Sequence, residues 1–497
     1  MQTVAEPGKP MNLHLHDPAL LHADSFIDGQ WRGAQQRFPV CNPASGETIA
    51  EVADLGAAAT REAIAAAQRA MASWRERPAT ERSTLLRRWF ELILAHREDL
   101  ARLMTAEQGK VLAEARLEIT YAASFVEWFA EEAKRIYGDL IPGPADRRAI
   151  VIKQPVGVVA AITPWNFPSA MITRKVGPAL AAGCAVVLKP AAETPLSALA
   201  LAELADRAGI PRGLLNVVTG TDAEAIGREL TASDTVRKLT FTGSTAVGKK
   251  LLSQSADTVK KVSMELGGNA PILVFADADL DAAVQGAIAS KYRNAGQTCV
   301  CANRLLVDDS IYDSFLEKFA ARVARFTVGD GMDENTTLGP LIDPRARAKV
   351  GAMVEDSVAA GARLVTGGQA LDELGPSFYQ PTVLADVTAD MRVFREEIFG
   401  PVAPVLRFRD EAEAIAMAND TEYGLAAYLY TADIGRVWRV SEAIEYGMVG
   451  VNEVAITSEL VPFGGMKASG LGREGSRYGI DDYVEVKYIC MGGINPA

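Results

Sequence analysis

The spacing of hydrophobic residues changes once along the chain. From Ala57 to Ala133, apolar residues recur at helical spacing among Arg and Glu. After Tyr137 they come in short runs instead. Val156–Ile162 is such a run, rich in valine and of the length of a buried strand. The pattern predicts a helical segment followed by a region built on strands.

Strands and helices then alternate regularly. We expect strands at 185–188, 215–218, 238–241 and 259–266, with helices at 170–181, 196–208, 223–230 and 247–255. This alternation is typical of parallel βαβ units and an open, doubly wound sheet. Ligands bind such sheets beyond the carboxyl ends of the strands. The candidate binding loops therefore follow Ile162, Leu188, Val218, Phe241 and Leu266.

A second alternating region runs from Pro271–Phe275 to about Gly470. Its expected strands lie at 304–307, 402–408, 426–430 and 447–451, and we interpret it as a second α/β domain. The tail Tyr483–Cys490 alternates apolar and polar residues, which predicts a terminal strand that joins a sheet of its own chain or of a partner.

Length and composition limit the class of protein. A chain of 497 residues is long enough for two or three domains. The net charge of −12 argues against a nucleic-acid partner. No run reaches the ~18 apolar residues of a membrane span, and we see no secretory signal. Five cysteines are too few for a disulfide framework, so we expect a cytoplasmic location.

The histidines restrict the chemistry. All four lie in the first hundred residues, so a histidine base beside a nucleophile in the later chain is not expected. No metal-ligand cluster is visible, and we expect no metal.

Four short motifs carry the candidate chemistry: Thr163–Pro168 (TPWNFP), Phe241–Gly248 (FTGSTAVG), Glu265–Gly268 (ELGG) and Asn294–Cys301 (NAGQTCVC). In order and spacing they resemble the aldehyde dehydrogenase superfamily, and the resemblance extends from about Phe26 to Cys490. It implies an aldehyde dehydrogenase-like α/β fold. The implied parts are a dinucleotide-binding domain (10–135 and 156–268), a catalytic domain (269–475) and a small β oligomerisation arm (136–155 and 476–497).

Cys299 is the candidate nucleophile. It lies in a Gly-Gln-Thr loop between an expected helix and strand, and its thiolate would attack the aldehyde. Without a histidine, Glu265 is the plausible general base for the water that hydrolyses the thioester. Asn166 can donate its side-chain amide, with the backbone N–H of Cys299, to the oxyanion. The resemblance implies the same three roles, with hydride transfer from the thiohemiacetal to a nicotinamide.

The expected cofactor is a nicotinamide dinucleotide. Gly243–Gly248 links a strand to a helix, so its amides suit a pyrophosphate. Ala192 stands where a glutamate would repel a 2′-phosphate, which favours NADP with NAD tolerated. The resemblance implies a cofactor site made of Ile162, Thr163, Trp165, Lys189, Ala192, Gly220, Gly243, Ser244, Gly248, Leu266, Glu397 and Phe399.

Within the superfamily the chain most resembles succinate-semialdehyde dehydrogenase, through MITRK, KYRNAGQTCVC and PFGGMKASGLGREGSRYG. The resemblance implies that Arg174 and Arg293, aided by Ser458, bind the carboxylate of a small aldehyde, a task that suits the planar guanidinium. The alternative is that both arginines form structural ion pairs. Glutarate semialdehyde is the competing substrate, because one methylene gives weak discrimination.

Three further expectations concern regulation, other activities and assembly. Cys301 could form a reversible disulfide with Cys299, or be a passive second cysteine. The intact catalytic residues argue against a non-catalytic scaffold, Glu265 argues against transfer of the thioester to coenzyme A, and the absence of a nearby histidine argues against a thiol protease. The resemblance implies a homodimer or homotetramer.

Overall fold

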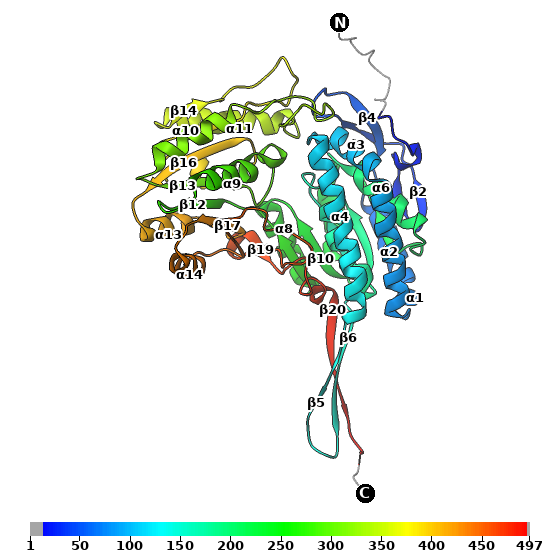
Figure 1. Ribbon diagram of the computed structural model, residues 1–497. Helices are drawn as coiled ribbons and strands as arrows, with labels where there is room; N and C mark the ends of the chain where they lie inside the picture. Colours follow the sequence, from blue (N-terminus) through cyan, green and yellow to red (C-terminus); the bar gives the residue numbers. More distant parts are fainter. Residues whose placement is uncertain (1–12, 495–497) are drawn as a thin grey trace.

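The computed structural model describes residues 13–494 and shows two lobes and a narrow projecting arm (Figure 1). Each lobe is built on one large sheet. The strand order is β19-β11-β10-β7-β8-β9-β1-β2 in the first sheet and β14-β15-β16-β13-β12-β17-β18 in the second. Helices pack around both sheets, so the predicted α/β class is confirmed. No helix within residues 13–494 is long and apolar enough to cross a bilayer.

The core of the first sheet is parallel, as the alternating pattern predicted. Sequence reasoning missed its short edge strands, which are antiparallel to their neighbours. The core strands are β7 (Val158–Ile162), β8 (Ala185–Lys189), β9 (Leu215–Val217), β10 (Val236–Thr242) and β11 (Lys261–Glu265), and the edge strands are β1 (Ser25–Ile27), β2 (Gln30–Arg32) and β19 (Gly470–Leu471).

The order of these strands creates a binding crevice. From β7 the chain adds β8 and β9 on one side, and then returns to add β10 and β11 on the other. The connections leave in opposite directions at this point, so the loops after β7 and β10 separate and leave room for a ligand. Two of the four motifs, TPWNFP and FTGSTAVG, occupy these two loops.

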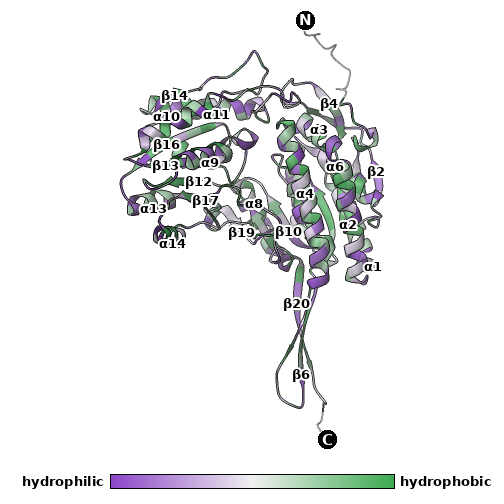
Figure 2. Ribbon diagram, viewed as in Figure 1, coloured by the Kyte–Doolittle hydropathy of each residue, from purple (hydrophilic) through white to green (hydrophobic). Residues whose placement is uncertain are grey.

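Helices of the first lobe bury apolar faces against this sheet and one another, while α2 and α4 also carry hydrophilic residues (Figure 2). The indole N–H groups of the buried Trp74 and Trp89 donate to carbonyls of Leu180 and Leu201, at 3.0 and 3.1 Å. The helices are α1 (Ala57–Trp74), α2 (Ala79–Ala95), α3 (Arg97–Gln108), α4 (Leu112–Glu132), α5 (Ala170–Ala182), α6 (Pro195–Arg207), α7 (Ala223–Ala232) and α8 (Thr245–Ser255).

The second sheet has its own apolar core and is parallel except for β14. Its strands are β12 (Ala270–Val274), β13 (Ala302–Asp308), β14 (Arg363–Thr366), β15 (Thr382–Ala385), β16 (Val402–Phe408), β17 (Ala426–Tyr430) and β18 (Met448–Val451). Its helices are α9 (Leu280–Tyr292), α10 (Tyr312–Val323), α11 (Pro344–Ala359), α12 (Arg392–Arg395), α13 (Glu411–Asn419) and α14 (Ile434–Ala443). A separate hairpin, β3 (Arg37–Cys41) with β4 (Thr48–Ala53), completes the fold.

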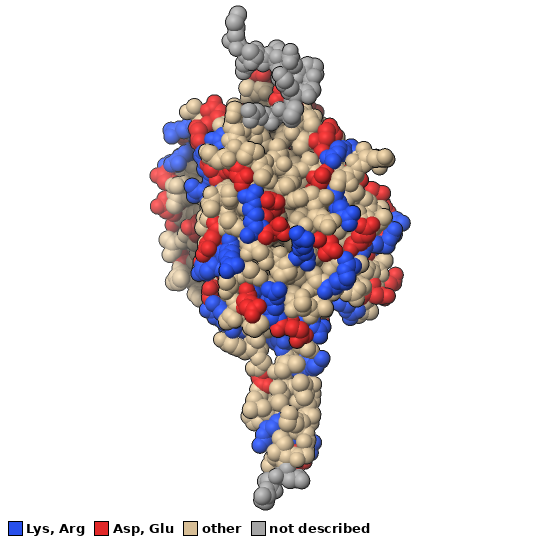
Figure 3. Space-filling model, turned by 90° about the vertical axis from the view of Figure 1, so that its right-hand side faces the viewer, with Lys and Arg blue, Asp and Glu red and all other residues tan. Residues whose placement is uncertain are grey.

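The arm is a three-stranded antiparallel sheet of β5 (Asp139–Ile141), β6 (Arg148–Pro155) and β20 (Val484–Met491). The predicted terminal strand is confirmed, and it pairs within its own chain. Apolar side chains of the arm, among them Leu140 and Tyr488, are exposed. Figure 3 shows few charges on the arm, whereas both signs mix over the body above it. Residues 10–12 and 495–497 of the expected segments lie outside the described residues.

Candidate active site

A cavity of about 270 Å³ opens at the carboxyl ends of β7, β10 and β11. It brings together residues from all four sequence motifs and from the loop before β16. Its lining consists of Pro164, Trp165, Asn166, Met171, Thr242, Gly243, Ser244, Leu266, Gly267, Cys299, Lys349, Glu397 and Phe399. Eight of these residues are ones that the sequence nominated for catalysis or cofactor binding.

Cys299 lies on a tightly wound loop between α9 and β13. The backbone of Asn294 and Ala295 in this loop has the left-handed conformation, with φ of 51° and 54°. The carbonyl of Val300 accepts a hydrogen bond of 2.6 Å from Tyr428, which fixes the loop beside the thiol. The half-buried thiol lies in surroundings that raise its pKa to about 12, mainly through desolvation and then through Glu397. Such a thiol is protonated at neutral pH, so attack requires a proton acceptor.

Glu265 is the last residue of β11 and is only 2% exposed. Neither carboxyl oxygen has a hydrogen-bond partner among the described residues. Burial raises the pKa of this carboxyl well above its usual value, and the nearby Glu474 raises it further. A Cβ at Gly464, where φ is +157°, would lie 2.9 Å from Oε1 of Glu265. A buried, unpartnered carboxyl with a raised pKa has the properties of a general base.

Asn166 joins the turn after β7 to the Cys299 loop. Its side-chain amide donates to the carbonyl of Gln297 at 3.0 Å. Its own carbonyl accepts hydrogen bonds from Nζ of Lys110 at 2.8 Å and from Nδ2 of Asn294 at 3.0 Å. The amide that could donate to an oxyanion is therefore held against the loop that carries the thiol.

The ELGG segment meets both the Cys299 loop and Glu397. A Cβ at Gly268 would lie 2.2 Å from the carbonyl oxygen of Cys299, so only glycine permits this approach. The amide of Gly268 donates to Oε1 of Glu397 at 3.1 Å, and that of Gly267 donates to Oγ1 of Thr245 at 3.2 Å. Glycines here let three motifs converge on one cavity.

The part of the cavity next to α8 combines backbone donors with aromatic walls. Ser244 caps α8 by accepting the amide of Val247 at 3.4 Å. Gly248 leaves room for Leu266, whose Cδ2 would lie 2.3 Å from a Cβ at that position. The rings of Trp165 and Phe399 meet edge to face at 5.5 Å. The exposed helix N-terminus supplies hydrogen-bond donors, the carboxyl supplies an acceptor and the two rings supply apolar walls. This combination suits a dinucleotide.

The other residues nominated for the cofactor do not line this cavity. Lys189 ends β8, and its buried ammonium donates to the carbonyl of Pro190 at 3.0 Å. Burial lowers the pKa of Lys189, and Glu193 opposes that shift. The amide of Thr163 donates to the carbonyl of Lys189 at 3.1 Å. The remaining positions follow or end neighbouring strands of the same sheet: Ile162, Ala192 and Gly220.

The three residues nominated for the substrate differ in their surroundings. Arg174 is 1% exposed, and its Nε lies 2.7 Å from Oε2 of Glu474, an ion pair without hydrogen-bond geometry. Arg293 is exposed, stacks over Phe167 at 5.4 Å, and makes no ion pair within the described residues. Ser458 is half-buried, and its Oγ accepts the amide of Leu460 at 3.2 Å.

A second cavity, of about 160 Å³, lies on the other side of the TPWNFP turn. The side chains of Arg293 and Phe167 line it. Tyr121 and Thr457 also contribute to its wall. The cavity is lined by Lys110, Glu114, Leu117, Glu118, Tyr121, Phe167, Arg293, Asn294 and Thr457.

Cys301 is buried, and its neighbour is a lysine. Nζ of the fully buried Lys291 lies 3.6 Å from Sγ of Cys301. Burial raises the pKa of Cys301, and Lys291 opposes that shift. All five cysteines are free thiols.

Sequence reasoning missed several charged residues around the site. Lys110 and Glu118 contact the Asn166 turn, and Glu474 pairs with both Arg174 and Lys175. One signal was available, because Glu118 lies on the apolar face of α4 between Ala115 and Ala122. Within residues 13–494, no cluster of His, Cys, Asp and Glu could hold a metal ion.

Comparison with known proteins agrees with this geometry. Residues 31–489 match the model of the aldehyde dehydrogenase family. The chain is 61% identical to the NADP-dependent succinate-semialdehyde dehydrogenase GabD of Escherichia coli, over 97% of this chain and 100% of that protein. It is 60% identical to a glutarate-semialdehyde dehydrogenase of Pseudomonas aeruginosa, with the same coverage. The crystal structure of a succinate-semialdehyde dehydrogenase from Burkholderia pseudomallei superposes with a TM-score of 0.95, at 59% identity, covering 96% of this chain and 100% of that one.

Proposed function

Because the chain belongs to the aldehyde dehydrogenase family and is an aldehyde dehydrogenase, we propose that it oxidises succinate semialdehyde to succinate with NADP. The unpaired guanidinium of Arg293, facing a cavity beside the Asn166 turn, is the observation that carries the choice of an anionic substrate. The names of two relatives, which describe aldehydes bearing a carboxylate, support the same class.

In this proposal the Cys299 thiol gives its proton to Glu265, which passes it to solvent, and the thiolate attacks the aldehyde carbonyl to form a thiohemiacetal. The side-chain amide of Asn166, with the backbone N–H of Cys299, stabilises the oxyanion. The Asn166 amide donates to the carbonyl of Gln297, in the same loop as Cys299, and this contact supports the role. Glu265 deprotonates the water that hydrolyses the thioester, because its buried carboxyl has a raised proton affinity.

Acceptance of the hydride is the chemistry that a bound nicotinamide dinucleotide would supply. Glu397 and Phe399 would hold its nicotinamide end, while Gly243 and Ser244 would bind the pyrophosphate at the α8 N-terminus. Trp165 and Leu266 line the same cavity and would contact the nicotinamide end as well. The adenosine end would lie against the nominated positions outside this cavity: Ile162, Thr163, Lys189, Ala192, Gly220 and Gly248.

We favour NADP over NAD because Ala192 leaves no carboxylate at the position that would repel a 2′-phosphate. Lys189, close by at the end of β8, supplies a cation for that phosphate. The name of the Escherichia coli relative, which specifies NADP, agrees with this preference.

The proposed carboxylate site combines Arg293 with Arg174 and Ser458. Arg293 has free donors in the second cavity, whereas Glu474 already pairs with Arg174. Nη2 of Arg174 is buried without a hydrogen-bond partner among the described residues, so it retains a donor for a substrate. Glutarate semialdehyde is the alternative substrate, since the same site would accept a chain one methylene longer.

The test compares kcat/KM for succinate semialdehyde, glutarate semialdehyde and uncharged butanal, each with NADP and with NAD. We expect succinate semialdehyde with NADP to give the highest value. Arg293→Ala should lower kcat/KM for both semialdehydes about 30-fold or more and leave butanal nearly unchanged, since a charge-assisted bidentate contact is lost. Arg409→Ala, which removes an exposed arginine far from the site, is the matched control. Equal losses on all three aldehydes would refute the carboxylate site.

Two further roles belong to this proposal. The segments 136–155 and 476–497, which contain the three strands of the arm, would join subunits into a dimer or tetramer, since the exposed apolar residues of those strands need a partner surface. The two lobes would serve as dinucleotide-binding (10–135, 156–268) and catalytic (269–475) domains.

The redox role of Cys301 is also a proposal, in which it forms a reversible disulfide with Cys299. Inactivation by peroxide should then be reversed by dithiothreitol. Inactivation that a thiol cannot reverse would count against it.

A further inference from the structure

A fully buried lysine supports the turn that carries Asn166. Lys110 lies between α3 and α4, and its side chain is 1% exposed. Nζ donates to the carbonyl of Asn166 at 2.8 Å and to Oε2 of Glu118 at 2.5 Å. It also lies 4.0 Å above the ring of Phe167, the next residue of the turn. One ammonium group therefore makes three contacts, two of them to the TPWNFP turn.

Glu118 fixes the other end of the same turn. Its Oε1 accepts the amides of Ser169 and Ala170, at 3.0 and 3.2 Å. These amides begin α5 and have no acceptor within that helix. A carboxylate at this end is favoured by the helix dipole. Lys110 and Glu118 together hold the turn at its middle and at its end.

Helix α4 reaches the Cys299 loop as well. Glu114, one turn before Glu118, accepts the backbone amide of Asn294 at 3.0 and 3.2 Å. Asn294 then donates from Nδ2 to the carbonyl of Asn166 at 3.0 Å. Helix α4 therefore contacts both the end of the Asn166 turn, through Glu118, and the loop of the nucleophile, through Glu114.

We propose that Lys110 and Glu118 are positioning residues that set the Asn166 amide relative to Cys299. Burying an ammonium and a carboxylate costs more solvation than an apolar pair of the same volume would, so stability alone is a weak reason for them. Their hydrogen bonds define the backbone of the Asn166 turn, and a small displacement of an oxyanion donor strongly lowers its effect. This inference rests on the role of Asn166 in the proposed function.

A double-mutant cycle tests the proposal. Lys110→Met should lower kcat about 10- to 100-fold in the wild-type background, because the oxyanion donor is misplaced. In an Asn166→Ala background the same change should lower kcat by no more than about twofold, since there is no donor left to position. Losses that multiply in the double variant would overturn the proposal.

A second measurement separates positioning from general damage. Alkylation of Cys299 by iodoacetamide forms no oxyanion, so its rate in Lys110→Met should stay within about twofold of wild type. A parallel loss of alkylation and turnover would show that the loop itself had collapsed, and would reject the proposal. Glu118→Gln keeps the size of the side chain and one acceptor oxygen. It replaces Lys110→Met in the double-mutant cycle with Asn166→Ala if Lys110→Met does not fold.

The matched control is Lys260→Met. Lys260 is also buried and also donates to backbone carbonyls, those of Leu230, Ser233 and Val236, but it lies at the start of β11, at the end opposite Glu265. The Lys260→Met substitution should lower thermal stability without changing kcat. A kcat loss equal to that of Lys110→Met would contradict the proposal. If the wild-type enzyme oxidises aldehydes and the Asn166→Ala variant is fully active, the result refutes the role of Asn166 in the proposed function, and not only the positioning role of Lys110.

Discussion

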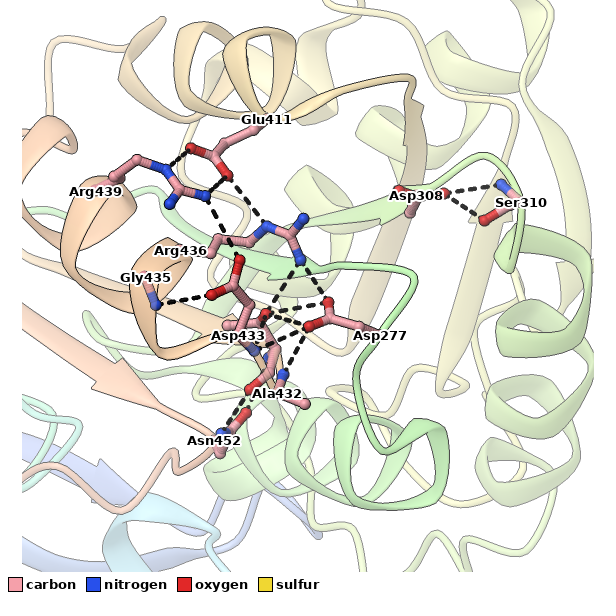
Figure 4. A network of polar contacts seen from close by, with 11 residues as sticks. Asp277, Asp308, Ser310, Glu411, Ala432, Asp433, Gly435, Arg436, Arg439 and Asn452 are labelled. Atoms are coloured by element: carbon pink, nitrogen blue, oxygen red, sulfur yellow. Dashed lines mark hydrogen bonds and ion pairs between the residues drawn. The ribbon is translucent and has the colours of Figure 1, made fainter.

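Two groups of carboxyl side chains in this molecule have opposite surroundings: Asp277 with Glu411, and Glu265 with its neighbour Glu474. In the second lobe, Asp277 accepts hydrogen bonds from Thr431, Ala432 and Arg436 at 2.8, 3.0 and 2.6 Å (Figure 4). Partial burial opposes ionisation of Asp277, but these donors hold its pKa below the usual value. Glu265 in the first lobe is buried, no donor reaches it among residues 13–494, and its pKa is raised.

The difference separates a structural ion from a reactive group. Each oxygen of Asp277 and of Glu411 has a partner, so these carboxylates are stable as ions and have little affinity for a proton. Glu265 lacks that stabilisation, so its proton affinity is high enough for base chemistry. Changes at the two clusters should therefore affect different properties, activity at one and stability at the other.

The largest effect should follow loss of the thiol. Cys299→Ser should lower kcat about 10⁴-fold or more, because a hydroxyl is a far weaker nucleophile with no histidine base nearby. Steady-state NADPH formation measures this, and Cys41→Ser, at an exposed cysteine of β3, should retain full activity. A Cys299→Ser enzyme with more than a few per cent of wild-type activity would remove the basis of the mechanism.

Glu265→Gln should lower kcat about 10²- to 10³-fold, since the amide cannot deprotonate water. The thioester should then accumulate, so a burst of NADPH precedes slow turnover. Because the pKa of Glu265 is raised by burial and by Glu474, the base form grows as pH increases, and kcat of the wild type should rise with pH until this carboxyl is fully ionised. The Gln variant should lose that rise; an unchanged pH profile would assign the base to another group.

The sequence predicted the parallel core strands of the first sheet well and its edge strands poorly. Runs such as Ala185–Lys189 are apolar throughout, which marks buried strands. Strands β1 and β2 have three residues each, too few to show alternation, and they belong to the first sheet only through pairing with distant β9. Short edge strands carry little information in their own residues.

The motifs located the cavity, but the long-range contacts of the charged residues around it could not be predicted. Cys299, Glu265 and Asn166 stand in short segments with glycine or proline neighbours, which are visible in one sequence. The pairing of Glu474 with Lys175 joins positions 299 residues apart, and only the folded chain brings them together. The same holds for Lys110, whose contact with Asn166 spans 56 positions.

A smaller effect should come from Glu397. Burial raises the pKa of this carboxyl to about 7, although the amide of Gly268 opposes the shift. As pH falls through 7 the carboxylate is lost, and with it the better acceptor for ribose hydroxyls. We expect the Kd for NADP to rise several-fold between pH 8 and pH 6, measured by fluorescence titration. Glu397→Gln should bind weakly at both pH values, and a pH-dependent Kd in that variant would exclude Glu397 as the cause.

The smallest effect on activity should come from the satisfied cluster. Arg436 donates to Asp277 and to Glu411 at 2.6 and 3.1 Å, and it stacks over Phe275 at 4.6 Å. Arg436→Met replaces the cation-π contact by an apolar contact with the ring and leaves two carboxylates with fewer donors, so the free energy of unfolding should fall by about 1 kcal/mol. Turnover should stay within about twofold of wild type, because no bond of this cluster reaches the cavity. A large loss of turnover with unchanged stability would mean that the two clusters are coupled, and that the division between structural and reactive carboxyls is not local.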